Sequence, residues 1–136
     1  MALIPTNING VAVEFHTTVN RDVHQSVIDG LKHCIKPQIA AGHLLTKIFI
    51  YSASDKHAMP SRHAQDKAVD ISRINGTHII DGYRRGGATK AIVDAIQETF
   101  ERYGNRRENF GPHFKKKSGQ PWSIVDHKDH IHISVN

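Results

Sequence analysis

The stretch "DHKDHIHISVN", residues 126–136, decides the fold. In a β-strand alternate side chains point to the same face. The end of this stretch therefore carries a polar set and an apolar set of side chains: His130, His132 and Ser134 on one face, and Ile131, Ile133 and Val135 on the other. The apolar face predicts a strand that packs on a core, while the histidine face must look into water or into a cleft.

A second stretch, "AVDIS" at residues 68–72, alternates in the same way. Val69 and Ile71 point one way, and Asp70 points the other way. If the two strands are neighbours in one sheet, Asp70 and His132 converge on its polar face. Histidine and aspartate side chains that converge in this way suggest a metal site.

A catalytic zinc ion typically has three protein ligands and one water, so a third ligand is needed. His63 stands seven residues before Asp70. This spacing cannot put both side chains on one face of a single helix or strand. We therefore expect His63 on a loop that folds back over the strand carrying Asp70.

The composition of the chain limits the metal ligands and the partners that it can have. The chain has 136 residues, which suits one domain spanning residues 1–136. Cys34 is its single cysteine, so a metal must be held by histidine nitrogen and carboxylate oxygen, ligands that suit zinc and several other divalent ions. The net charge of +5 favours a polyanionic partner, either nucleic acid or the acidic polymers of a bacterial envelope. No apolar run is long enough to span a membrane, and "MALIPTNING" lacks the features of a secretory signal.

The remaining periodicities predict an α+β domain: a mostly antiparallel sheet that carries the metal site, flanked by two helices. We expect a hairpin of two strands over residues 68–83 whose tight turn is Asn75-Gly76, and a polar loop over residues 104–121. The other predicted elements are strands at 10–15 and 44–54, a helix that Asn20 caps and Pro37 ends, and a helix within 86–104 that Thr89 caps and Gly104 stops.

Two motifs resemble those of the LAS-type zinc peptidases, peptidase family M15. "SRHAQDKAVD" (61–70) is similar to S-x-H-x-x-G-x-A-x-D, and "HIH" (130–132) to H-x-H. The family includes D-Ala-D-Ala peptidases, phage L-alanyl-D-glutamate endolysins and the hedgehog signalling domain. The resemblance covers about residues 44–136, with the motifs in the family's order. It implies a hedgehog/DD-peptidase-like fold.

The resemblance also implies roles for individual residues. One zinc ion would be bound by His63, Asp70 and His132. Asp129, three residues before the last ligand, would be the general base, and His130 would orient water or substrate beside the metal. An aspartate pKa near ~4 suits a base best when desolvation raises it. His127 is a rival for the place of His130.

Substrate binding is where the chain departs from the family pattern. Asp66 replaces the motif's glycine, and "YSASDK" replaces a stretch like "SGYR", which leaves Lys56 as the nearest cation. Lysine lacks the planar fork of arginine that binds a carboxylate through two hydrogen bonds. The expected substrate-binding residues are Ser61, Lys56 and His113.

The function implied is zinc-dependent hydrolysis of a peptide bond in the stem peptide of bacterial peptidoglycan. We expect a monomeric phage endolysin that cuts at L-Ala-D-Glu or at a D-Ala-containing bond. It would be made in the host cytoplasm and reach the cell wall after release, without membrane insertion or a specific nucleic-acid partner. Two alternatives stay open: a non-catalytic zinc-binding module of the same fold, and a basic nucleic-acid-binding domain built on "RYGNRR" and "FKKK".

Overall fold

Residues Ile131–Val135 form strand β11, whose apolar side chains join the core as its alternating pattern predicts, and β11 lies inside the main sheet. The computed structural model describes residues 1–54 and 61–136. In it β11 runs antiparallel to β6 (Ala68–Ile74) on one side and to β8 (Arg106–Phe110) on the other. The two strands expected at residues 68–72 and 130–135 are therefore direct neighbours, which is the condition under which Asp70 and His132 were expected to converge.

The main sheet has the strand order β10-β9-β8-β11-β6-β5-β3-β2, with β7 paired to β6. Within the described part of the chain, β3 and β5 form its one parallel pair, so the sheet is mostly antiparallel. A separate two-stranded sheet joins β1 to β4. The bounds of the strands not yet given are β1 (Ala2–Leu3), β2 (Asn7–Ile8), β3 (Val11–Phe15), β4 (Asp22–Val23), β5 (Lys47–Ser52), β7 (Thr77–His78), β9 (Lys115–Lys117) and β10 (Gln120–Pro121).

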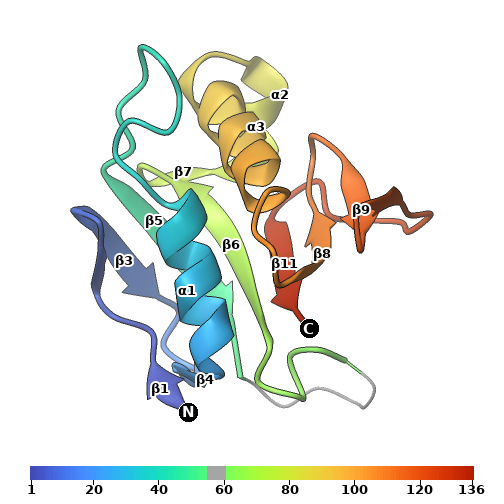
Figure 1. Cartoon of the computed structure of the whole chain (residues 1–136). Helices are drawn as coiled ribbons and strands as arrows, with labels where there is room; N and C mark the ends of the chain where they lie inside the picture. Colours follow the sequence, from blue (N-terminus) through green and yellow to red (C-terminus); the bar gives the residue numbers. More distant parts are fainter. Residues whose placement is uncertain (55–60) are drawn as a thin grey trace.

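The helices are α1 (Gln25–Cys34), α2 (Ile79–Arg85) and α3 (Ala88–Phe100). Figure 1 shows α1 and α3 side by side across one face of the sheet. The hydrophobic core lies between these helices and the sheet, and the apolar side chains of β11 and β6 belong to it. Each fully buried Ile, Val or Phe contributes roughly 1.5–3 kcal/mol. The described helices include none that is long and apolar enough to cross a membrane.

The hairpin between β6 and β7 has the predicted tight turn. Asn75 (φ 52°) and Gly76 (φ 80°) both have positive φ, as a type I′ turn requires. The second arm is shorter than the prediction, because a strand was expected to continue through Tyr83 whereas α2 begins at Ile79. Two consecutive isoleucines break the alternation there, and Ile79 and Gly82 form the buried face of a helix instead.

Three other predictions about elements are corrected. The first helix begins at Gln25, not after Asn20, because Asp22 and Val23 pair with the N-terminal strand β1. Residue Gly87, not Thr89, occupies the N-cap of α3, and the helix ends before Gly104. The segment 104–121 is not a loop: it contains β8, β9 and β10, which extend the sheet beyond β11.

Candidate metal centre

Asp70 and His132 are cross-strand partners in β6 and β11. Their side chains leave the sheet on the face opposite the helix-packed alternates Val69, Ile71 and Ile133. The Nδ1 atom of His132 lies 2.8 Å from Oδ1 of Asp70. The convergence expected from strand alternation alone is therefore present.

His63 reaches this pair from the turn over residues 61–67. The turn is closed by hydrogen bonds from the backbone N–H of His63 to Oγ of Ser61 (3.2 Å) and from the N–H of Lys67 to the carbonyl of Arg62 (2.9 Å). The imidazole donates from Nδ1 to the carbonyl of Ala53, at 2.8 Å. His63 is thus a loop residue folded back over β6, as predicted, and its Nε2 points at the other two side chains.

The candidate ligand atoms of the three side chains lie close together, and Asp70 faces His132 through Oδ1 and His63 through Oδ2. Nε2 of His63 lies 3.2 Å from Oδ2 of Asp70 and 3.2 Å from Nδ1 of His132. A tetrahedral zinc ion with bonds near ~2.0–2.1 Å has ligand atoms about 3.3 Å apart. The observed separations of 2.8–3.2 Å are close to that value, so His63, Asp70 and His132 could hold a metal ion.

Glu108 on β8 completes the surroundings of His132. Its Oε1 accepts hydrogen bonds from Nε2 of His132 (3.0 Å) and from Oγ of Ser134 (2.7 Å). A carboxylate on the far nitrogen fixes the tautomer of the imidazole and makes its other nitrogen a better ligand. Sequence reasoning missed Glu108 because "RRENF" has no apolar alternation and was assigned to a loop.

The charged forms of Asp70, Glu108 and His132 stabilise one another. Burial by itself would raise the pKa of Asp70, but hydrogen bonds from His132 and His63 bring that pKa well below its usual range. Burial likewise disfavours the charged form of His132, yet Asp70 and Glu108 raise its pKa to about 9. The pKa of Glu108 falls to about 2, since its bonds with His132 and Ser134 outweigh its burial.

The arrangement of the two imidazoles calls for a positive charge between them. His63 donates one nitrogen to the Ala53 carbonyl, and His132 donates one to Glu108, so their inner nitrogens face each other at 3.2 Å. Two lone pairs at this distance repel unless a proton or a cation lies between them. A proton on His132, whose pKa is raised to about 9, can fill this role, and a metal ion could take the same place.

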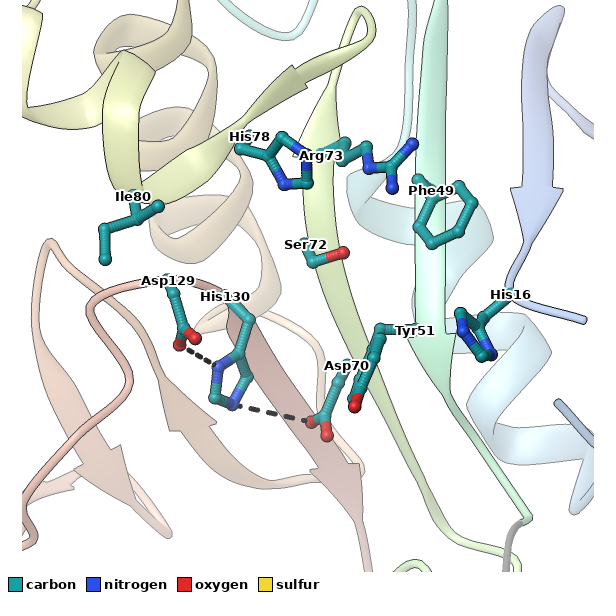
Figure 2. A pocket seen from close by; sticks show the side chains of 10 residues that line it. All are labelled: His16, Phe49, Tyr51, Asp70, Ser72, Arg73, His78, Ile80, Asp129 and His130. Atoms are coloured by element: carbon teal, nitrogen blue, oxygen red, sulfur yellow. Dashed lines mark hydrogen bonds and ion pairs between the residues drawn. The ribbon is translucent and has the colours of Figure 1, made fainter. Parts of the chain in front are cut away.

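Asp129 and His130 stand beside the cluster, just before β11 begins. Nδ1 of His130 donates to Oδ1 of Asp129 at 2.6 Å, and its Nε2 lies 4.0 Å from Oδ1 of Asp70 (Figure 2). Asp129 thus lies in the irregular segment just before the strand begins. The hydrogen bond with His130 lowers the pKa of Asp129, the opposite of the upward shift that suits a base.

Two hollows flank Asp129 and His130, and both of these residues line each of them. The first, here called the cleft, has a volume of about 550 Å³ and also contains Asp70 and Tyr51. The second has a volume of about 730 Å³ and is also lined by residues of the segment 124–128. An extended ligand crossing from one hollow to the other would pass the Asp129–His130 pair.

The remaining predicted residues lie at different distances from the cluster. The His127 ring is 4.9 Å from that of His130 and 5.8 Å from that of His132, which suits an outer position rather than a ligand. His113 is held against α3 by Glu98 (2.9 Å) and lines neither hollow as far as the structure describes them. Ser61 lines a separate small pocket that includes Glu108, and Lys56 lies outside the described residues.

Comparison with protein-family models, curated proteins and solved structures finds no match for this chain. Membership of the zinc peptidase family therefore stays a prediction from the two motifs. The class that the fold and the site define is an α+β domain with a His-Asp-His group able to hold a metal ion.

Proposed function

We propose that this protein is a zinc-dependent peptidase with a hedgehog/DD-peptidase-like fold, which hydrolyses a peptide bond in the stem peptide of bacterial peptidoglycan. The observation that carries the proposal is the largely buried group of His63, Asp70 and His132, which lies beside the Asp129–His130 pair. The likeness of its two motifs to those of LAS-type peptidases supports the substrate class. Within that class we favour a phage endolysin, released to the cell wall, that cuts at L-Ala-D-Glu or at a D-Ala-containing bond.

In this proposal the residues of the chain divide the work. His63, Asp70 and His132 hold one zinc ion, which when bound polarises a peptide carbonyl and lowers the pKa of water toward ~7. Asp129 accepts a proton from the attacking water and passes it to the leaving amine. His130 orients the carboxylate of Asp129 through the 2.6 Å hydrogen bond, and the two flanking hollows accommodate the peptide on either side.

The proposal is tested by incubating the zinc-loaded protein with purified peptidoglycan and measuring new amino groups. We expect release that stops when a chelator removes the metal and returns when zinc is added back. Release that a chelator does not affect, or no release at all, would reject the peptidase. A protein that binds zinc with no release would instead be the non-catalytic module of the same fold.

Two variants separate metal binding from proton transfer. His132→Ala should lose zinc and activity together, because it removes a ligand. Asp129→Ala should keep stoichiometric zinc and lose activity by about 10²–10⁴-fold, the usual contribution of a general base. Full activity in Asp129→Ala would transfer the role of base to His130 or His127.

A further inference from the structure

The cationic side chain of Arg73 lines the cleft, and Arg73 belongs to neither of the two zinc-site motifs. It lines the same hollow as Asp70, Asp129 and His130, and Figure 2 shows its guanidinium beside the ring of Phe49. Of the described residues lining this cleft, Arg73 is the one lysine or arginine. A positive charge beside the candidate metal centre can bind an anionic group of a ligand.

A β-bulge directs Arg73 into the cleft. On β6, Asp70 and Ser72 face the cleft by normal alternation, which would turn Arg73 toward the core. The pairing with β5 slips here: Arg73 is opposite Phe49, but Ile71 is already opposite Ile50, so β6 carries one extra residue at this point. A bulge of this kind re-aims side chains, and here two consecutive residues, Ser72 and Arg73, line the cleft while Ile74 returns to the core.

Among the residues that the structure describes, the guanidinium has no anionic partner. Its Nε is buried and makes no hydrogen bond, and no carboxylate of the described residues lies within ion-pair distance of Arg73. The Cζ atom lies 4.2 Å from the centre of the Phe49 ring, a cation–π contact that holds the side chain in place. Such a contact leaves the hydrogen-bonding edge of the guanidinium unused, and a buried donor without an acceptor is costly.

We propose that Arg73 binds a free carboxylate of the substrate peptide, so that the enzyme prefers substrates with a negative charge near the bond it cuts. This inference rests on the proposed peptidase function. Arginine suits the role because its planar fork donates two parallel hydrogen bonds to a carboxylate. Asp70 and Arg73 are three strand residues apart, roughly 10 Å, which corresponds to about two or three residues of an extended peptide.

The test uses the synthetic stem peptide L-Ala-γ-D-Glu-L-Lys-D-Ala and two singly amidated forms, one at the α-carboxylate of D-Glu and one at the C-terminus. The variants are Arg73→Gln and Arg73→Lys, with Arg85→Gln as a control at an exposed arginine on α2. For the free peptide we expect Arg73→Gln to lower kcat/KM by about 10–100-fold, mainly through KM, as for a lost charged hydrogen bond. Arg73→Lys should recover part of this loss, and Arg85→Gln should match the wild type.

Amidation identifies the carboxylate. One of the two amidated peptides should be cut slowly by the wild type, and at the same rate by Arg73→Gln, since the partner of the guanidinium is then gone. The zinc content of every variant should equal that of the wild type, which separates substrate binding from metal loss. If Arg73→Gln cuts all three peptides as the wild type does, the carboxylate site is wrong and the peptidase function stands.

A binding measurement keeps the two proposals separate. In the metal-free protein, the NMR signal of the Arg73 Nε–H should shift when the free peptide is added and should not shift with the amidated form identified above. If the wild type hydrolyses nothing but this shift occurs, the peptidase function fails and the carboxylate site holds. If hydrolysis occurs and the Nε–H signal is unaffected by all three peptides, the carboxylate site is overturned.

Discussion

At the scale of single residues, Glu108 shows how the candidate metal ligand His132 is held in position. A carboxylate that accepts from Nε2 of His132 leaves Nδ1 as the ring nitrogen that faces Asp70 and His63. The same carboxylate accepts from Ser134, which stands two residues along β11 on the same face. Three strands therefore fix one imidazole: β11 carries it, β6 supplies its neighbour in the cluster, and β8 orients it.

Glu108→Gln should weaken zinc binding by about 10–100-fold, as loss of a carboxylate behind a ligating histidine generally does. The loss should lie toward the tenfold end at neutral pH, because removing the charge also lowers the pKa of His132 and so reduces competition by protons. Competition with a chelator of known affinity measures the effect. Glu98→Gln, which alters the exposed carboxylate beside His113, serves as the control and should leave affinity unchanged. Equal affinity in both variants would show that Glu108 does not support the metal site.

At the scale of elements, the parts predicted from sequence are those with a regular apolar period. Residues 68–72 and 130–135 alternate cleanly, so their strands, their pairing and the meeting of Asp70 with His132 followed from local pattern. The polar segment 104–121 has no such period, because its strands extend the sheet through backbone pairing rather than through an apolar face: β8 pairs with β11, β9 with β8, and β10 with β9. Glu108 and the bulge at Arg73 depend on strand register, which single-strand patterns do not contain.

The turn over residues 61–67 explains a departure from the peptidase motif. Asp66, at the motif's glycine position, has φ 61°, a left-handed conformation that glycine adopts freely and aspartate tolerates. Its side chain accepts a hydrogen bond from Ser54, and its carbonyl accepts from the N–H of His24 at 2.8 Å. The backbone shape that glycine would permit is thus kept, with an added contact to the end of β5.

Asp66→Ala should lower the free energy of unfolding by about 1–2 kcal/mol, since it keeps the left-handed strain and loses the Ser54 hydrogen bond. Asp66→Gly should be close to neutral, because relief of strain offsets that loss. Urea unfolding of the zinc-free proteins measures both, and zinc affinity should stay within about threefold in Asp66→Gly. An Asp66→Gly protein less stable than Asp66→Ala would show that the side chain, not the backbone conformation, determines this turn.

At the scale of the whole molecule, the cluster of His63, Asp70 and His132 joins parts of the chain that are distant in sequence. The helices α1 and α3 cover one face of the sheet (Figure 1). The His63, Asp70 and His132 cluster lies on the opposite face and joins β6, β11 and the 61–67 turn. In the metal-free protein the raised pKa of His132, about 9 against 6.5 when unperturbed, links this junction to proton binding. Stabilisation from this proton is complete below pH ~6.5 and is lost as pH rises through ~9.

Zinc should reverse the effect of pH on this junction. The metal takes the place of the proton on His132, so its apparent affinity should rise by about tenfold per pH unit up to pH ~9. Because a ligand stabilises by RT ln(1 + [L]/Kd), the gain in unfolding free energy at a fixed free zinc concentration should grow by about 1.4 kcal/mol per pH unit. Urea unfolding at pH 6.5, 7.5 and 8.5, with zinc buffered by a chelator and with chelator alone, measures the difference. His132→Ala should abolish this pH dependence. A zinc-induced gain that is the same at all three pH values would place the metal away from His132.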